Sequence, residues 1–329
     1  MWPRSDRRRE SAQGSPPDSH FYSVYGLTVE SALELPELIP TRCRQPNVQI
    51  CFGQVPETLS DPIGRADWCM ASRSEFIFSA EGVARYHVAG GGRITIERRV
   101  GPKSAAPASD IRLWLLGTAF GALLHQRGLL PLHVSAVKSP NGVWAFAGDS
   151  GEGKSTLAGF LHGRFGWDLV SDDVSVIDLQ GDRPLIRSGP RKLKLWEDAL
   201  RHLGYDGRSA VRDLSSNQKF QLYLPTHAVC QAERLTALVL LESTSDGLSP
   251  SLEIVRGREA FDVCLSAVYR PYMARLFKCT AKELVELAAL ANCIQIYRFR
   301  RPRSLGDFES NLTPLLNQIR TNETSEISS

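Results

Sequence analysis

The chain has 329 residues and a formal net charge of +3, and 42% of its residues are hydrophobic. This length predicts two domains, the hydrophobic content excludes a largely disordered chain, and the small net charge gives no reason to expect nucleic-acid binding. The longest uncharged apolar run, 113–124, is too short to cross a membrane, and the polar start of the chain lacks the pattern of a signal peptide. The seven cysteines form no C-x-x-C pair and suit a reducing compartment. We therefore expect a cytoplasmic protein that binds neither nucleic acid nor membrane.

The first hundred residues have the pattern of a β domain. Residues 1–20 are polar and rich in Ser, Pro and Arg, which predicts a disordered tail, and 321–329 have a similar composition. Between 21 and 100, short alternating apolar runs are separated by glycine-rich turns, which predicts a mostly antiparallel β domain. The expected strands are 21–29, 48–52, 75–78, 83–88 and 93–97. Nothing in this domain indicates chemistry.

A linker and a connecting helix are expected at 101–128, and an α/β domain at 129–320. Asp110 is expected to cap the helix, which runs over 111–126 and ends at Gly128. In the α/β domain the expected strands are 132–137, 143–147, 168–171, 174–177, 235–241 and 294–299. The expected helices are one from Thr156 to Gly166, then 258–269, 281–291 and 308–319.

The most specific motif of the chain lies between the strand 143–147 and the helix that begins at Thr156. It matches the phosphate-binding pattern G-x-x-x-x-G-K-[ST] at every fixed position, with the residues Gly148, Asp149, Ser150, Gly151, Glu152, Gly153, Lys154 and Ser155. Such a loop wraps its amides around an anion, and the following helix adds the positive end of its dipole. We expect residues 148–156 to bind ATP, with Lys154 at the β- and γ-phosphates and Ser155 on Mg²⁺. The alternative is a glycine-rich turn that matches by chance.

Asp172 and Asp173 follow the strand after the loop helix. Ligands of open α/β sheets bind beyond the carboxyl ends of the strands, so both carboxylates are expected beside the phosphates. Phosphoryl transfer to a hydroxyl needs one carboxylate for Mg²⁺ and another to accept the hydroxyl proton. The alternative is a turn in which Asp acts as a cap.

His133 is expected to lie beside the loop. If the turn 139–142 is a hairpin loop, Lys138 pairs with Val143, and counting back places His133 opposite Gly148. There the imidazole can orient the nucleophile or raise the pKa of a neighbouring Asp. The alternative, equally open, is a strand histidine satisfied by the backbone.

Two further sets of charged residues have a functional and a structural interpretation. One set can bind phosphate or an acidic substrate, or can form a solvated face, and consists of Arg187, Arg191, Lys192 and Lys194. For the arginines in 298–303 we expect a solvated surface. Glu242 ends an apolar run, as the water-activating acid of many ATPases does, but a surface position at a strand end is the alternative.

Three of these segments together resemble the C-terminal catalytic domain of HPr serine kinase/phosphorylases. They are Leu132–Val137, Gly148–Ser155 and Leu169–Asp173. The β-rich first part and the segment 124–133 are more similar to the HPr-kinase-related proteins of bacteria, which include kinases of peptide-modification gene clusters. The resemblance implies a P-loop kinase that uses ATP and Mg²⁺. It also implies that Asp172 is the base for a serine hydroxyl, that Asp173 assists the metal, and that His133 tunes the acid.

The chain departs from the HPr enzymes at one signature. Those enzymes have an acid before an arginine soon after the Asp pair, whereas the stretch Leu185–Pro190 has no acid before Arg187. This weakens HPr as the substrate and weakens the reverse phosphorylase reaction. The sequence therefore predicts transfer of the γ-phosphate of ATP to a serine hydroxyl of a peptide or small protein. The alternative is an ATPase or nucleotide switch without such transfer. The acceptor (peptide, HPr-like protein or small alcohol) and a homo-oligomer stay open.

Overall fold

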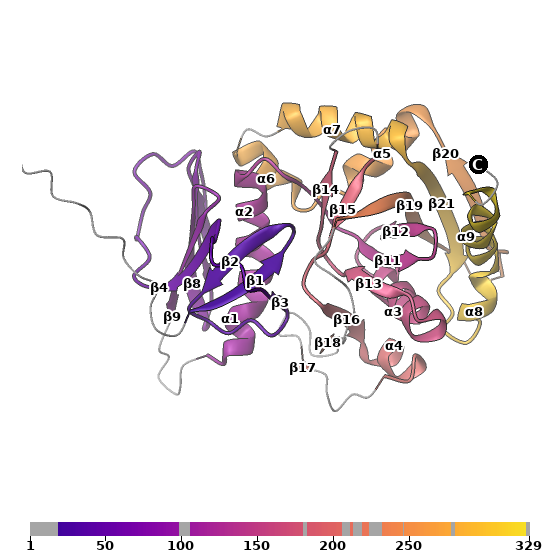
Figure 1. The fold of residues 1–329 in the computed structure, drawn as a ribbon, viewed down its shortest axis with the longest axis horizontal. Coiled ribbons are helices and arrows are strands. Elements are labelled where there is room, and N and C mark those ends of the chain that lie inside the picture. Colours follow the sequence, from indigo (N-terminus) through magenta and orange to yellow (C-terminus); the bar gives the residue numbers. More distant parts are fainter. Residues whose placement is uncertain are drawn as a thin grey trace, which may run out of the picture.

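The computed structural model describes residues 19–98, 106–179, 183–205, 211–212, 219–223, 232–245, 247–277 and 280–326. An N-terminal β-sheet and a larger α/β body lie on either side of one long helix (Figure 1). Within the described ranges, no helix is both long enough and apolar enough to cross a membrane.

The N-terminal sheet has the strand order β3-β1-β2-β4-β9-β8-β7-β6-β5. The pairs β2–β4 and β4–β9 are parallel and the other pairs are antiparallel, which agrees with the predicted strand pattern. The strands are β1 (His20–Val24), β2 (Leu27–Ser31), β3 (Ile39–Pro40), β4 (Val48–Phe52), β5 (Gly64–Ala66), β6 (Cys69–Ala71), β7 (Glu75–Ala80), β8 (Ala84–Ala89) and β9 (Arg93–Arg98).

One predicted strand of this sheet is a hairpin. The run 21–29 divides into β1 and β2 at Tyr25 and Gly26, whose φ angles are 54° and 75°. Two-residue hairpin turns favour positive φ at both central positions because their twist then matches the flanking strands. The alternation of apolar residues continues across the turn, which is why the pattern predicted a single strand.

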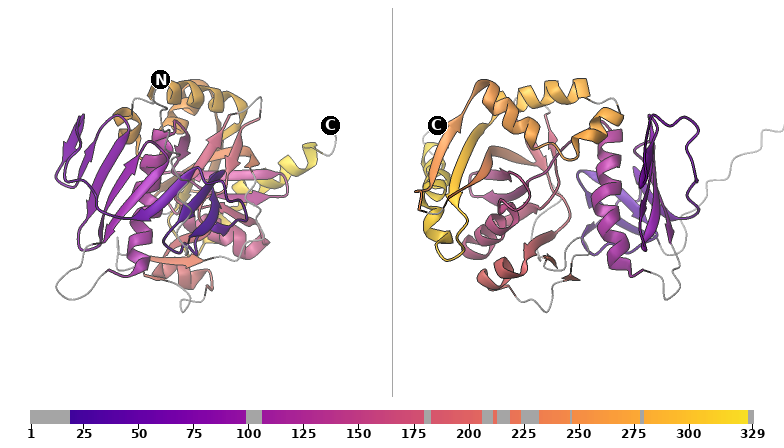
Figure 2. Two further views of the ribbon diagram at one scale, coloured as in Figure 1. Left: turned by 60° about the vertical axis from the view of Figure 1, so that its left-hand side comes forward. Right: turned by 180° about the vertical axis from the view of Figure 1, so that it is seen from behind.

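The long helix packs along one face of this sheet (Figure 2). It comprises α1 (Ala108–Trp114), a π-helical segment η1 (Leu115–Ala119) and α2 (Phe120–Gln126). It begins two residues before the predicted cap, so Asp110 lies in the first turn, where its charge favours the helix dipole. Gly128, with a φ of 63°, follows the end of the helix as predicted.

The α/β body is built on a sheet with the order β10-β14-β15-β19-β12-β11-β13, in which β21 also pairs with β19, and β20 with β21. The strands are β10 (Leu130–Leu132), β11 (Ser135–Ser139), β12 (Gly142–Ala147), β13 (Asp168–Ser171), β14 (Ser175–Asp178), β15 (Leu185–Arg187), β19 (Ala232–Thr244), β20 (Ser251–Val255) and β21 (Gln295–Pro302). The helices are α3 (Lys154–Phe165), α4 (Glu197–His202), α5 (Gly257–Ser266), α6 (Pro271–Leu276), α7 (Thr280–Cys293), α8 (Phe308–Asn311) and α9 (Thr313–Glu326). A small sheet adds β16 (Lys192–Trp196), β18 (Lys219–Tyr223) and β17 (Val211–Arg212).

Alternate residues of β12 serve two cores, which gives the body three layers. Trp144 and Phe146 pack with apolar residues of α3, α8 and α9, whereas Ala145 and Ala147 pack with those of α5 and α7. The parallel strands β12, β19 and β21 end at the same edge of the sheet. The connection from β12 to α3 therefore lies at the carboxyl edge, where ligands of such sheets bind.

Two further predictions need correction. The strand 132–137 is interrupted: β10 ends at Leu132, and the His133 amide donates to the carbonyl of Ala267 at 2.6 Å instead of pairing with Gly148. The predicted hairpin register, Lys138 opposite Val143, is nevertheless confirmed. The tail predicted to begin at 321 is helical as far as Glu326, because α9 continues through it. Residues 1–18 and 327–329 lie outside the described ranges.

Candidate active site

The glycine-rich loop leaves β12 at Ala147 and enters α3 at Lys154. Gly148, Gly151 and Gly153 have φ angles of 140°, 95° and 82°, which other residues rarely adopt. A Cβ at Gly148 would also lie 2.7 Å from the carbonyl oxygen of Leu241. The first glycine is therefore required both by the backbone conformation and by the close approach of β19.

Lys154 is the first residue of α3, and its side chain turns back onto the loop. Its Nζ donates to the carbonyl oxygens of Gly148 at 2.7 Å and Asp149 at 3.1 Å. Burial lowers the pKa of Lys154, and the charges of Asp172 and Asp173 oppose this shift. The ammonium group is thus held by the loop close to two carboxylates.

A cavity of about 400 Å³ opens on the loop and brings most of the predicted site residues together. Its lining includes residues 150–156 and the predicted His133, Asp172 and Asp173. Gly148 and Asp149 do not line it and act through their carbonyl oxygens on Lys154. Of the remaining lining residues, only Lys194 was among the functional candidates from the sequence. These residues are Ser135, Lys194, Trp196, Asp198, Ala199, Lys219, Arg301, Arg303, Ser304, Leu305 and Phe308.

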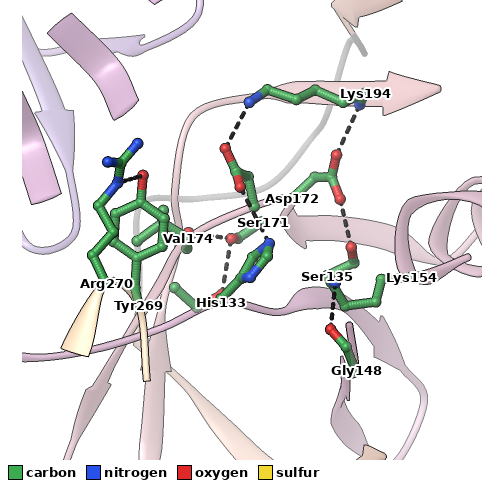
Figure 3. A network of polar contacts seen from close by, with 12 residues as sticks. His133, Ser135, Gly148, Lys154, Ser171, Asp172, Val174, Lys194, Tyr269 and Arg270 are labelled. Carbon is green, nitrogen blue, oxygen red and sulfur yellow. Dashed lines mark hydrogen bonds and ion pairs between the residues drawn. The ribbon is translucent and has the colours of Figure 1, made fainter. Parts of the chain in front are cut away.

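Asp172 is buried and hydrogen-bonded from several sides (Figure 3). The Ser135 hydroxyl donates to its Oδ1 at 2.5 Å, and the Lys194 amide donates to its Oδ2 at 2.8 Å. Burial raises the pKa of Asp172, and the hydrogen bonds from Ser135, Lys194 and the Ser155 hydroxyl counteract part of that increase. Asp172 is therefore the carboxylate that contacts Ser155.

Asp173 has different neighbours and a left-handed backbone, with a φ of 85°. Its Oδ2 lies 2.7 Å from Lys194 Nζ, and its Oδ1 lies 3.5 Å from His133 Nε2. Burial raises the pKa of Asp173, but Lys194 and His133 outweigh burial and hold that pKa well below its usual range. Burial lowers the pKa of His133, as do the charges of Lys154, Lys194 and Arg270, and Asp173 only partly opposes this.

Of the four basic residues singled out between 187 and 194, only Lys194 lines the cavity. Arg187 pairs with Asp178, and Arg191 donates to the carbonyl of Leu38 at 3.3 Å. In β16, Lys194 and Trp196 share one face, while Leu193 and Leu195 are buried on the other. The alternation K-L-K-L-W predicts this strand. It does not predict that the face with Lys194 lies next to the carboxylate of Asp173.

Two of the arginines expected on a solvated surface at 298–303, Arg301 and Arg303, instead contact the site. Arg301 is only 6% exposed and donates from Nη2 to the carbonyl of Glu152 at 3.1 Å. Arg303 pairs with the Glu152 carboxylate, which also accepts from Ser243. Because the end of β21 packs against the loop, Arg301 is buried, whereas Arg303, which follows the strand, reaches the loop from a largely exposed position.

Glu242 has a structural role. It pairs with Arg298 at 3.1 Å and Arg300 at 3.0 Å on the neighbouring strand β21. It is also not among the residues that line the cavity. These contacts do not favour Glu242 as an activator of water.

Comparison with known proteins finds similarity among solved structures alone. No family model and no curated protein matches the chain. Among solved structures, the chain is similar to the Hpr(Ser) kinase/phosphatase from Coxiella burnetii, at 13% identity and a TM-score of 0.31, over 59% of this chain and 98% of that chain. A similarity at this TM-score says nothing about what the chain does.

Proposed function

We propose that the chain is a kinase that transfers the γ-phosphate of ATP to a serine hydroxyl of a peptide or small protein. One observation carries the proposal: a glycine-rich loop with a buried lysine shares a cavity with two adjacent carboxylates of different surroundings. Phosphoryl transfer needs these parts, because its catalysis is mainly positioning and charge stabilisation.

The apolar part of the cavity lining supports a nucleotide over a bare polyphosphate. Besides the loop and the charged groups, Trp196, Leu305 and Phe308 give the cavity an aromatic and apolar lining. Planar bases stack on such side chains, and pockets for small molecules combine apolar walls with a few polar groups.

The oxygen donors at the loop fit Mg²⁺. The Ser155 hydroxyl and the Asp172 carboxylate are in contact, and Mg²⁺ binds through one or two protein oxygens together with phosphate and water. When bound, the ion neutralises charge on the β- and γ-phosphates. The sequence-based assignment gave Asp173 to the metal and made Asp172 the base. We propose the reverse, because Asp172 contacts Ser155 whereas Asp173 contacts His133 and Lys194.

In this mechanism Asp173 accepts the hydrogen bond of the serine hydroxyl and orients its oxygen towards the γ-phosphorus. The bond from the γ-phosphorus to the bridging oxygen breaks while the serine oxygen–phosphorus bond forms, which leaves ADP and phosphoserine. The serine proton moves to Asp173 Oδ1, beside His133 Nε2, only as the oxygen–phosphorus bond forms and makes the hydroxyl acidic, because the lowered pKa of Asp173 makes it a weak base before that. Lys154 and Lys194 stabilise the negative charge on the transferred group.

The test uses radiolabelled ATP, a panel of serine peptides and HPr. Asp173→Asn should lower transfer roughly 10²–10⁴-fold at saturating Mg²⁺ while ATP still binds. Asp172→Asn should instead raise the Mg²⁺ concentration required for half-maximal rate. Glu242→Gln is the matched control and should transfer phosphate like the wild type. Hydrolysis that depends on Glu242, with no transfer to any acceptor, would instead support the ATPase alternative.

A further inference from the structure

Backbone strain gathers around one side of this site. Among the described residues, the only non-glycine residues with positive φ are Tyr25, Asp173 and Arg270, at 54°, 85° and 48°. They come from the β1–β2 turn, the end of β13 and the start of α6. Tyr25 and Tyr269, the neighbour of Arg270, are buried, and the charge of Asp173 acts on both. The hairpin turn accounts for the φ of Tyr25, and the positive φ of Asp173 and Arg270 is backbone strain of the kind found at functional sites.

Arg270 is held in place without an acidic partner. Its Nε donates to the Tyr269 hydroxyl at 3.0 Å, and its Nη1 donates to the Tyr272 hydroxyl at 3.2 Å. Within the described ranges, no carboxylate lies at ion-pair distance from its guanidinium. A guanidinium has five N–H donors in a planar fork, so the two phenols fix Arg270 and leave donors for an anion.

The position of Arg270 relates it to the acceptor and not to the nucleotide. The rings of His133 and Tyr269 meet edge to face, with centroids 6.1 Å apart. In Figure 3, Tyr269 and Arg270 lie on the side of His133 away from Lys154 and Gly148. The phosphates are expected on the Lys154 side, so a hydroxyl that attacks from the opposite side passes His133. Arg270 does not itself line the cavity and lies beyond His133, where a group next to that hydroxyl can reach it.

Three other partly buried cations of the fold already have acidic partners. Lys194 contacts Asp173, and Arg187 contacts Asp178. Arg112 contacts Glu37 at 2.7 Å. The segment around Arg187, which the sequence offered for an acidic substrate, is therefore engaged within the fold, whereas Arg270 has donors to spare.

We propose that Arg270 binds a carboxylate that the acceptor carries next to its reacting hydroxyl. This rests on the proposed kinase function, since it assigns the acceptor side of the same site. An arginine fork binds a carboxylate through two parallel hydrogen bonds, which fixes direction as well as charge. The carboxylate is either the terminal group of a C-terminal serine or the side chain of an acidic neighbour.

The test measures binding of product-like peptides by calorimetry in the presence of ADP and Mg²⁺. The probes are acetyl-Gly-Gly-phosphoserine with a free carboxylate, the same peptide amidated, and an amidated form with Asp after the phosphoserine. The free acid should bind about tenfold more tightly than the amide, because a charge-assisted bidentate contact is lost on amidation. The third peptide distinguishes a terminal from a side-chain carboxylate.

Three variants assign the effect to the guanidinium. Arg270→Gln should remove the preference for the acid, and Arg270→Lys should keep only part of it because lysine lacks the fork. Arg275→Gln, an exposed arginine of the same helix, is the control and should retain the full preference. If the Arg270→Gln variant melts at a clearly lower temperature than the wild type, the Tyr272→Phe variant is measured in its place. That change removes one hydrogen bond of Arg270 and should reduce the preference for the free acid over the amide.

The inference is overturned if wild-type protein binds every peptide equally, if it binds none up to millimolar concentration, or if the preference survives in Arg270→Gln. Failure of the proposed function has a different signature. It appears as absent binding of ADP and Mg²⁺ to the wild type, or as binding that Lys154→Ala leaves unchanged.

Discussion

At the scale of single residues, the site depends on how two adjacent carboxylates are kept different. Ser135 donates a hydrogen bond to Asp172, and both side chains are buried at the wall of the cavity. Ser135→Ala should raise the pKa of Asp172 further and weaken the metal affinity that we assign to it. Because hydrogen bonds to charged groups contribute about 1.5–3 kcal/mol, we expect roughly a tenfold or greater increase in the Mg²⁺ concentration for half-maximal rate. A Mg²⁺ titration checks this, and Ser139→Ala, at the far end of the same strand, is the control.

The ion pairs of Asp173 give a prediction for stability against pH. The folded-state pKa of Asp173 is lowered, so its contribution is present above the unfolded pKa, near 3.9, and is lost as pH falls towards the folded value. Asp173→Asn should therefore lower the free energy of unfolding more at pH 7 than at pH 3. Asn tolerates a left-handed backbone, so the substitution adds no strain. Urea unfolding at the two pH values measures the difference, and an equal loss at both would contradict the ion-pair argument.

At the scale of elements, β16 carries two side chains to the cavity at once. Lys194 and Trp196 are two residues apart on one face of the strand, so Trp196 extends the cavity beyond the charged group. If a nucleobase stacks there, Trp196→Ala should weaken ATP binding roughly tenfold or more, on the basis of ~1–3 kcal/mol for a stacked base. Binding of tripolyphosphate should not change, and Trp196→Phe should retain most of the affinity. Trp68→Ala, an exposed tryptophan of the N-terminal sheet, is the matched control.

Local pattern accounts for the elements that the sequence predicted. The loop 148–155 and the Asp172–Asp173 pair were recognisable because each is contiguous and flanked by a strand. His133 was expected opposite Gly148 by counting along a strand, but the strand stops at Leu132 because the His133 amide bonds to Ala267. Ser135 and Lys194 reach Asp172 from separate strands, so no spacing in the sequence connects them. Arg270 depends on the short helix α6, which has no clear apolar period of its own.

At the scale of the whole molecule, the N-terminal sheet shares its core with the α/β body. Apolar residues of the sheet and of the long helix form one cluster with Val174 and Val176, which directly follow the Asp pair, and with Met273 of α6. The amide of Tyr25 also donates to the carbonyl of Ser188 at 2.9 Å. The structure thus gives the N-terminal sheet a part in positioning the segments that carry Asp173 and Arg270.

Glu37 tests this coupling. Its carboxylate is buried, accepts from Arg112 of the long helix at 2.7 Å and from Tyr223 of β18 at 3.1 Å, and its carbonyl accepts from the Arg191 amide at 2.8 Å. Removing one partner of a buried ion pair usually destabilises the folded state by ~3–5 kcal/mol, and we expect about 2–3 kcal/mol for Glu37→Gln because Arg112 keeps some exposure.

If the N-terminal sheet and the α/β body fold as one unit, the Glu37→Gln variant should still unfold in a single transition, at a lower urea concentration. The transitions followed by tryptophan fluorescence and by far-UV circular dichroism should then coincide. Glu34→Gln, an exposed acid of the same segment, should change neither midpoint nor slope. Two separated transitions, with the α/β body melting as in the wild type, would show that the sheet is an independent domain and that its contacts with Arg191 and Ser188 do not support the site.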